Sequence, residues 1–238
     1  MNPSSSPRVR LTEDGRPKAE LRTYTRRGSR FTAKQQDAWD RRAAEWVIPD
    51  AAVDEAGFSL ADVFGREAPL IVEIGSGIGE ATAALGAARP TYNLLAFEVW
   101  RPGVADTLVQ LEKTGATNVR LISVDAVWCV ENLLGPESVS ELWTFFPDPW
   151  PKKKHHRRRL VTPGFASLAT SRLVPGGHWR LATDWPDYAE QMREVLNAEP
   201  GLEGGPVERW EERPVTKFER RGLREGRPGE DFCYRRRS

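Results

Sequence analysis

Apolar runs and amphipathic segments alternate along most of this chain. Runs rich in Leu, Ile, Val and Phe predict buried strands, and the segments between them carry apolar residues at helical spacing. The predicted strands span residues 70–74, 92–97, 119–124, 140–146 and 178–182. The predicted helices span residues 79–88, 103–114, 126–134, 163–172 and 187–197. This alternation favours an α/β fold with a mostly parallel sheet, helices on both faces and a ligand crevice at the carboxyl ends of the strands.

The segments before and after this region also show hydrophobic patterns that predict secondary structure. In residues 33–47 apolar side chains recur at helical spacing, which predicts an amphipathic helix docked on the core. After Pro200, two further runs predict strands at residues 207–211 and 231–235. We expect these two strands to form an antiparallel pair at the C-terminus.

The first 32 residues differ from the rest. Residues 1–20 are rich in Ser, Pro and charge, a composition typical of segments that are disordered when free. Residues 21–32 interleave Arg with aromatic residues, as in an arm that folds onto RNA, although a floppy tail would have the same composition. We therefore predict a basic, flexible arm over residues 1–32 and a single domain over residues 33–238.

The first predicted strand runs into a glycine-rich loop. Gly75, Gly77 and Gly79 allow a tight turn and a close approach of the backbone to a ligand. The spacing G-x-G-x-G differs from the G-x-G-x-x-G of dinucleotide-binding loops, and Glu80 opens the next helix where a phosphate would sit. A ligand with an adenosine and a cationic head fits better than an anion. S-adenosylmethionine is such a ligand, and its ammonium and sulfonium groups suit Glu73.

Acidic residues also end the next two predicted strands. Glu98 follows the second strand, where a carboxylate can accept hydrogen bonds from both hydroxyls of a ribose. Asp125, followed by Ala126, ends the third strand and can accept a hydrogen bond from an adenine amino group. A lone acid at a strand end is commonly only the N-cap of the next helix. Together with Glu73, however, the three acids end three successive strands, which favours a cofactor site.

The fourth strand leads into a loop of unusual composition, Phe145-Phe146-Pro147-Asp148-Pro149-Trp150-Pro151. Prolines fix the backbone on both sides of Asp148, and Trp150 offers a ring for stacking on a base. Residues 152–159 then supply six Lys or Arg residues and no acid, as a phosphate-binding run would. Each part alone also suits an ordinary turn or a solvated face. Combined on one loop, they indicate a site that acts on a base within a nucleic acid.

The net charge of +1 conceals a segregation of charge along the chain. Lys and Arg outnumber Asp and Glu by 11 to 6 in residues 1–47, by 6 to none in residues 152–159 and by 9 to 4 in residues 213–238. The remainder is acidic. Basic segments on an acidic body can attract a polyanion despite the nearly neutral average.

Other features exclude several classes of protein. No apolar run is long enough for a membrane span, and the N-terminus lacks a hydrophobic signal segment, so we expect a cytoplasmic protein. The two cysteines, Cys129 and Cys233, suggest reduced structural thiols and neither a disulfide framework nor a cysteine zinc site. We expect no metal, and we interpret His155 and His156 as companions of the basic run.

The chain resembles the bacterial tRNA (guanine-N7-)-methyltransferases, the TrmB family, over residues 21–235. The motifs that carry the resemblance are, in order, the Arg-rich arm leading into Thr32-Ala33-Lys34-Gln35-Gln36, the glycine loop after Glu73, Phe97 to Val104, Asp125-Ala126, Phe146 to Lys153, Thr183-Asp184-Trp185 and Thr216 to Gly222. The proline-flanked Asp with its basic run and the late Thr-Lys-Phe-Glu are the most specific of these. Trp100 departs from the family, since many relatives carry His there.

The resemblance implies a class I, Rossmann-like S-adenosylmethionine-dependent methyltransferase fold, with a mostly parallel sheet and an antiparallel C-terminal strand. It implies methyl transfer from S-adenosylmethionine to N7 of a guanosine in the variable loop of tRNA, with Asp148 as the catalytic residue. The cofactor-binding residues that carry over are Glu73, Gly75, Gly77, Glu98, Asp125, Ala126 and Asp148. The contacts to tRNA or guanine that carry over are Lys152, Asp184, Thr216, Lys217, Phe218 and Glu219.

Three other functions share parts of this pattern. A nicotinamide-dependent oxidoreductase would share the sheet but should show the G-x-G-x-x-G loop, which is missing. A noncatalytic RNA-binding protein would share the basic segments but has no use for three acids at strand ends. An RNA adenine methyltransferase would also use an acid-proline-aromatic loop, and the identity of the methylated base separates it from the guanine enzyme. The sequence leaves open whether the chain is a monomer or a homodimer.

Overall fold

The computed structural model describes residues 22–25 and 28–238. In this part of the chain the strands are β1 (Val47–Ile48), β2 (Leu70–Ile74), β3 (Asn93–Phe97), β4 (Val119–Ile122), β5 (Val139–Phe145), β6 (Leu173–Thr183), β7 (Leu202–Val207) and β8 (Glu230–Arg236). The helices are α1 (Ala33–Trp46), α2 (Leu60–Phe64), α3 (Glu80–Ala88), α4 (Arg101–Thr114), α5 (Ala126–Asn132), α6 (Pro163–Arg172), α7 (Pro186–Ala198) and α8 (Lys217–Arg224). Two short 3-10 helices, η1 (Ala52–Asp54) and η2 (Lys153–Arg158), complete the described elements.

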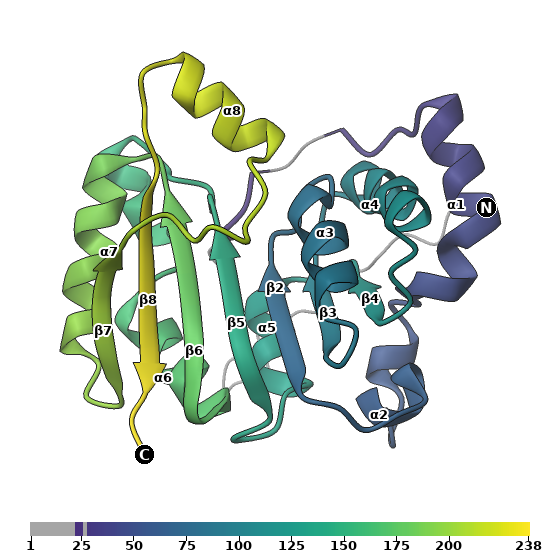
Figure 1. The fold of residues 1–238 in the computed structure, drawn as a ribbon, viewed down its shortest axis with the longest axis horizontal. Coiled ribbons are helices and arrows are strands. Elements are labelled where there is room, and N and C mark those ends of the chain that lie inside the picture. Colours follow the sequence, from purple (N-terminus) through teal and green to yellow (C-terminus); the bar gives the residue numbers. More distant parts are fainter. Residues whose placement is uncertain (1–21, 26–27) are drawn as a thin grey trace, which may run out of the picture.

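The strands form one sheet in the order β1-β4-β3-β2-β5-β6-β8-β7 (Figure 1). Strands β1 to β6 pair in parallel, whereas β8 pairs antiparallel with both β6 and β7. The predicted fold class is therefore confirmed, including the antiparallel C-terminal strand. Because the first six strands are parallel, their carboxyl ends meet at one edge of the sheet, and α8 lies above this edge in Figure 1.

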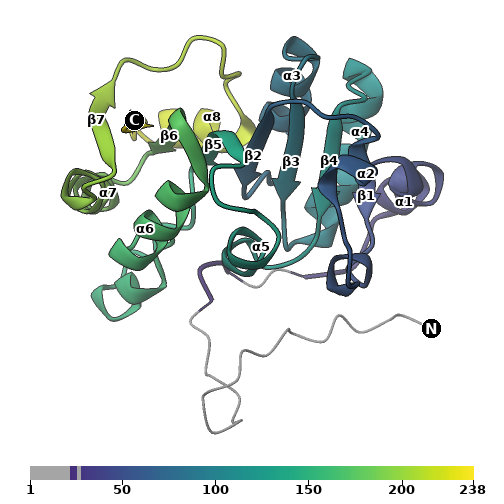
Figure 2. The same cartoon turned by 90° about the horizontal axis from the view of Figure 1, so that it is seen from below.

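Helices cover the sheet from both sides (Figure 2). One apolar core packs the sheet against α5, α6 and α7 and includes Cys129, Phe165 and Tyr188. The other packs it against α1, α3 and α4 and includes Leu85, Leu108 and Trp143. Strands buried on both faces read as continuous apolar runs, which is why the sequence pattern located them.

The predicted N-terminal helix is α1, which docks on the sheet edge near β4. A capping box at Thr32 starts it, because Gln35 N–H bonds the Thr32 hydroxyl while the Gln35 side chain accepts from Thr32 N–H. Gln35 also donates to the Pro102 carbonyl over 3.2 Å, and Trp46 Nε1 donates to the Ala116 carbonyl over 3.2 Å. These contacts fix α1 beside α4, with the first turn of α1 near the start of α4 and its last residue near Ala116.

The strand predicted at residues 207–211 is wrong in position, because β7 spans Leu202–Val207. Its Gly-Gly-Pro centre resembles a turn in sequence, yet Gly204 is needed in the strand for close pairing with β8. Its φ is +146°, and a Cβ there would lie 2.2 Å from the Cys233 carbonyl oxygen. Residues after Val207 leave the sheet, and Trp210 packs on Trp143 with ring centroids 5.5 Å apart.

Helix α8 was not predicted from the sequence. In α8, Glu219 and Gly222 are buried, so the helix has no apolar stripe of the kind that reveals a helix in sequence. The prediction of a disordered segment at residues 1–20 lies outside the described residues. Within the described part, no helix is long and apolar enough to cross a bilayer.

Candidate active site at the carboxyl edge of the sheet

The glycine loop joins β2 to α3 at the carboxyl edge. Gly75, Gly77 and Gly79 have φ values of 79°, 61° and 75°, the left-handed region that glycine tolerates best. A Cβ on Gly79 would lie 2.4 Å from the Thr107 methyl carbon, and one on Gly103 would lie 2.3 Å from the Gly77 carbonyl oxygen. The loop therefore needs glycine both for its turns and for its close packing on α4.

Glu98, directly after the neighbouring strand β3, forms hydrogen bonds with the glycine loop. Its carboxylate accepts hydrogen bonds from Gly77 N–H over 2.8 Å and from Trp100 N–H over 2.7 Å. The structure thus brings Glu98 and the glycine loop together, as the sequence predicted. Its contact with a ribose stays a prediction.

Glu73 is buried beneath the loop. It is 2% exposed, and its carboxylate accepts a hydrogen bond from the Thr82 hydroxyl over 2.6 Å. Burial, assisted by the charge of Glu98, raises the pKa of Glu73 to about 7. A carboxyl group held in this way favours a nearby cation, which agrees with the predicted role but does not test it.

Asp125 has the capping role that we considered as the alternative. It is the N-cap of α5, and its Oδ1 atom accepts a hydrogen bond from Trp128 N–H over 3.1 Å. Ala126 is the first residue of that helix. Both residues lie at the carboxyl end of β4, two strands from β2, so the capping role and a contact to adenine are compatible.

Two buried hydroxyl groups at this edge lack a hydrogen-bond partner among the described residues. They belong to Ser76 in the glycine loop and to Ser123 directly after β4. Buried polar groups are normally paired, so such atoms suit a site that a polar ligand completes. The donor and acceptor groups of this edge therefore fit the nucleoside of S-adenosylmethionine.

Asp148 follows β5, the next strand to β2 in the sheet. The chain turns sharply there, because Phe146 and Trp150 have φ values of 51° and 46°, uncommon for large side chains. Phe146 N–H bonds the Ala182 carbonyl over 2.7 Å, which ties the start of the turn to β6. Asp148 therefore follows the turn at the carboxyl end of β5, the strand that neighbours β2 and its glycine loop.

The described part of the N-terminal arm contacts the Asp148 loop and, further along, the residue before α4. Thr25 N–H donates to Asp148 Oδ2 over 2.6 Å, and Trp150 Nε1 donates to the Thr23 carbonyl over 3.0 Å. Further along, Trp100 Nε1 donates to the Gly28 carbonyl over 2.8 Å. The sequence suggested an arm that folds onto RNA and gave no sign of these contacts, because they depend on backbone groups.

The basic run is divided between exposed and buried side chains. Lys152, Lys153, Lys154 and Arg157 are exposed, as a phosphate-binding run requires. The reading of the whole run as one phosphate-binding surface is wrong for Arg159, whose side chain is 1% exposed and contacts protein groups. The basic run therefore combines exposed cations with one buried arginine, Arg159, that bonds to the protein.

The Thr216 to Glu219 segment meets the glycine loop. Thr216 is the N-cap of α8, and Lys217 N–H donates to Glu80 at the start of α3. Phe218 is 42% exposed, and a Cβ on Gly77 would lie 3.7 Å from its ring. Glu80, which argued against a phosphate at this loop, is thus the acceptor that holds α8 over the loop.

Glu219 directs its carboxylate toward two arginines, and its contact with a substrate stays a prediction. It is 4% exposed, and both carboxylate oxygens are held by Arg209 and Arg213. Arg213 in turn donates to Asp231 over 2.7 Å. A carboxylate at this position serves to anchor α8, because its hydrogen-bonding positions are used by buried arginines.

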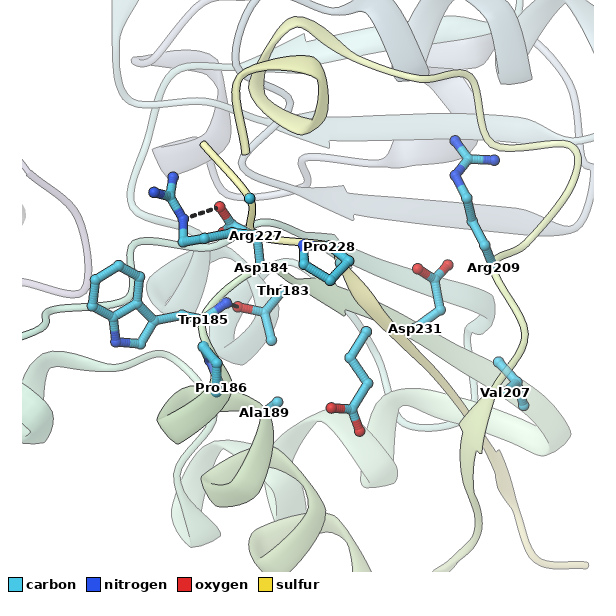
Figure 3. A pocket seen from close by; sticks show the side chains of 13 residues that line it. Thr183, Asp184, Trp185, Pro186, Ala189, Val207, Arg209, Arg227, Pro228 and Asp231 are labelled. Carbon is cyan, nitrogen blue, oxygen red and sulfur yellow. Dashed lines mark hydrogen bonds and ion pairs between the residues drawn. The ribbon is translucent and has the colours of Figure 1, made fainter. Parts of the chain in front are cut away.

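Asp184 lies at a separate pocket next to this edge. Its Oδ2 atom accepts a hydrogen bond from Arg227 Nε over 3.0 Å (Figure 3). The pocket has a volume of about 450 Å³ and lies between the start of α7, the end of β7 and the turn before β8. Trp185 and Arg209 also line it. The contact of Asp184 with tRNA or guanine stays a prediction.

The class of protein follows from the fold and this edge. The model of a family described as "Putative methyltransferase" matches residues 67–231. The solved structure of the 16S rRNA methyltransferase KamB superposes with a TM-score of 0.54 at 15% identity, over 77% of this chain and 96% of that one. An antibiotic-related methyltransferase gives 0.54 at 15% identity, over 79% and 98% of the two chains. The fold is that of the class I, S-adenosylmethionine-dependent methyltransferases.

Curated relatives narrow the class to a family. The tRNA (guanine-N(7)-)-methyltransferase of Nocardioides sp. is 63% identical over 97% of this chain and 93% of its own length. The enzymes of the same name from Cutibacterium acnes and Bordetella pertussis are 48% and 43% identical, over 90% and 91% of this chain and 82% and 85% of their own lengths. The chain belongs to the tRNA (guanine-N(7)-)-methyltransferase family.

Proposed function

We propose that this chain transfers a methyl group from S-adenosylmethionine to N7 of a guanosine in the variable loop of tRNA. The observation that carries the proposal is the position of Asp148. It follows β5, which neighbours β2 and its glycine loop at the same edge of the sheet. A carboxylate on a fixed turn next to a nucleoside-binding loop can hold a base against the cofactor.

The reaction requires little acid–base chemistry. Guanine N7 carries an in-plane lone pair and no proton, so no base has to remove a proton from it. Bound S-adenosylmethionine supplies an electrophilic methyl group: the bond from N7 to the methyl carbon forms as the bond to sulfur breaks. The protein therefore acts mainly through positioning and electrostatics, and the chemistry needs no metal.

Asp148 supplies both effects in this proposal. Its carboxylate can accept hydrogen bonds from the N1–H and amino groups of guanine, which orients N7 toward the methyl group. Its negative charge offsets the positive charge that develops on the ring. Thr25 N–H already bonds Asp148 Oδ2 over 2.6 Å, so the guanine has to share this carboxylate with the arm or displace it.

The residues of the edge have distinct tasks toward the cofactor. Glu98 holds the glycine loop, and in this proposal it also accepts from the ribose, while Asp125 and Ala126 contact the adenine. Glu73, with its pKa raised to about 7 by burial, would face the cationic head of the bound cofactor in this proposal. Gly77 and its neighbours permit the close approach of the backbone.

The tRNA is expected to lie across the basic surfaces next to the edge. Lys152, Lys153 and Lys154 on one side and Lys217 on α8 are exposed, so their ammonium groups can contact phosphates. These cations flank the loop that carries Asp148. A tRNA substrate places the reaction in the cytoplasm, where we expect the protein to act.

The experiment that tests the proposal is nucleoside analysis after methyl transfer. The protein is incubated with S-adenosylmethionine labelled in the methyl group and with tRNA transcripts that carry guanosine or adenosine at the variable-loop position. We expect label in N7-methylguanosine with the first transcript and none with the second. Label in a methyladenosine, or no transfer to either transcript, would contradict the proposal.

A further inference from the structure

Arg159 is the last residue of the basic run, but it does not face solvent. Its side chain is 1% exposed, whereas Arg157, two residues earlier in the same run, is exposed. A charged side chain is almost never fully buried unless it is paired. The burial of Arg159 therefore requires an explanation other than phosphate binding.

The guanidinium group directs its donors at protein groups. Its Nε atom donates to the Pro149 carbonyl over 2.9 Å. One terminal nitrogen donates to Gln191 over 2.9 Å and to the Asp187 carbonyl over 3.3 Å. The other donates to Asp187 Oδ2 over 2.8 Å and lies 3.2 Å from His156 Nε2. A guanidinium has five N–H groups: four donate within the protein, and the fifth is directed at His156 Nε2, which accepts it in the tautomer that carries its proton on Nδ1.

The side chains around the Arg159 guanidinium are also buried or hydrogen-bonded. The guanidinium lies over the ring of Tyr188, 4.8 Å from the ring centroid. Tyr188 is fully buried, and its hydroxyl accepts a hydrogen bond from Val161 N–H over 3.1 Å. Gln191 also donates to the Val161 carbonyl over 2.9 Å. Arg159 thus connects the loop after β5 to the start of α7.

The contact with Pro149 is the one that matters for the reaction. Pro147, Pro149 and Pro151 have no backbone N–H, so this loop has few donors with which to hold its own shape. The Pro149 carbonyl belongs to the peptide that enters Trp150, whose φ of 46° is uncommon for a bulky residue. A donor fixed from outside the loop can hold that peptide in place.

The energetics favour a positioning role over a stabilising one. The counter-ion of Arg159, Asp187, is 49% exposed, so it is partly screened by water. Replacing a buried ion pair by apolar side chains of similar volume is often neutral or stabilising. An apolar residue here would, however, leave the Pro149 carbonyl without its donor and the loop without its external tie.

We propose that Arg159 is a positioning residue for methyl transfer, which fixes the Pro149–Trp150 peptide and through it the direction of the Asp148 carboxylate. The proposal rests on the proposed function, in which Asp148 holds the guanine. Arg159 itself touches neither substrate nor cofactor.

The test compares Arg159→Lys with Arg157→Ala in the full chain. Lysine keeps the charge but cannot reach Pro149, Asp187 and Gln191 at once. We expect kcat for tRNA to fall by at least about tenfold, since a misplacement of about 1 Å can cost about a hundredfold. The Kd for S-adenosylmethionine should stay within about twofold, and the salt dependence of tRNA binding should not change.

Arg157→Ala is the contrasting variant, because Arg157 is exposed and belongs to the predicted phosphate-binding surface. In this variant the slope of log affinity against log salt should fall by roughly one unit and the KM for tRNA should rise. Arg159→Lys with a wild-type kcat, or with the same loss of salt slope as Arg157→Ala, would overturn the proposal.

Arg159→Met covers the case in which Arg159→Lys does not fold. Methionine is unbranched and apolar, so it buries no unpaired charge, but it removes the donor to the Pro149 carbonyl, and kcat should fall while the KM for tRNA stays the same. A folded Arg159→Met protein with wild-type kcat would then refute the positioning role. If the wild-type protein itself forms no N7-methylguanosine, the proposed function fails instead, so the two failures are distinguishable.

Discussion

Replacing Glu219 with alanine distinguishes an anchor for α8 from a contact to the substrate. The carboxylate accepts hydrogen bonds from Arg209 over 2.7 and 3.1 Å and from Arg213 over 2.9 and 3.4 Å. Burial alone would raise the pKa of Glu219, but the hydrogen bond from Arg209 and the charge of Arg213 lower it below its usual 4.5. The folded state therefore favours the ionised carboxylate.

The magnitude follows from what the substitution leaves behind. Removing one partner of a buried ion pair costs about 3–5 kcal/mol, because the other charge stays buried. Arg213 is fully buried but keeps Asp231 at 2.7 Å, so we take the lower end, about 3 kcal/mol. For a protein of this size, that corresponds to a Tm lower by about 6–12 °C.

The assay is thermal unfolding at pH 7 and pH 3.5, with Glu225→Ala as an exposed control. Since the folded pKa of Glu219 is lowered, its stabilisation is present above pH 4.5 and is lost as the pH falls through the folded pKa. The difference between wild type and Glu219→Ala should therefore shrink at pH 3.5, whereas Glu225→Ala should change Tm little at either pH. A Glu219→Ala protein that keeps the wild-type Tm but loses affinity for tRNA would refute the anchor and restore a substrate contact.

Three further outcomes are expected. Replacing Glu98 or Asp125 with alanine should weaken S-adenosylmethionine binding by about 1–3 kcal/mol in calorimetry, the range for a hydrogen bond to a charged group; unchanged affinity in both would remove them from the cofactor site. Neutralising residues 152–154 and Arg157 should raise the KM for tRNA and flatten its salt dependence without affecting cofactor binding, and an indifferent salt slope would make the run a mere solvated face. Because burial raises the pKa of Glu73 to about 7, the free energy of unfolding should fall by up to about 3 kcal/mol between pH 4.5 and 7 in urea titrations; a Glu73→Gln protein with the same pH dependence would contradict this.

The parts of the fold that the sequence predicted are those that local patterns determine. Parallel strands buried on both faces show as apolar runs, and helices packed on one side show as amphipathic segments. The acids Glu73, Glu98 and Asp148 were found because each lies at or next to the end of such a run. The carboxyl ends of parallel strands necessarily meet, so the sequence order also gave their proximity.

The parts that the sequence could not predict depend on partners far along the chain. In the sequence, Arg159 was assigned to the phosphate-binding run and Glu219 to a substrate contact. Their burial becomes evident only when Asp187 is paired with Arg159, and Arg209 and Arg213 with Glu219. The arm contacts Asp148 through the backbone N–H of Thr25. Nearly every residue has a backbone N–H, so the sequence does not indicate which one forms this contact. Helix α8 buries Glu219 and Gly222 instead of apolar side chains, because ion pairs hold it in place.

Rapid-quench methyl transfer by Asp148→Asn tests the central claim most directly. Asparagine keeps the shape and can still accept from Thr25 N–H, but it removes the charge. With tRNA and S-adenosylmethionine saturating, we expect the rate of N7-methylguanosine formation to fall by at least about a hundredfold, the scale of losing one well-placed electrostatic group. The Tm and the affinity for S-adenosylmethionine should stay near those of the wild type. A folded variant with the wild-type rate would remove Asp148 from the mechanism and contradict the account.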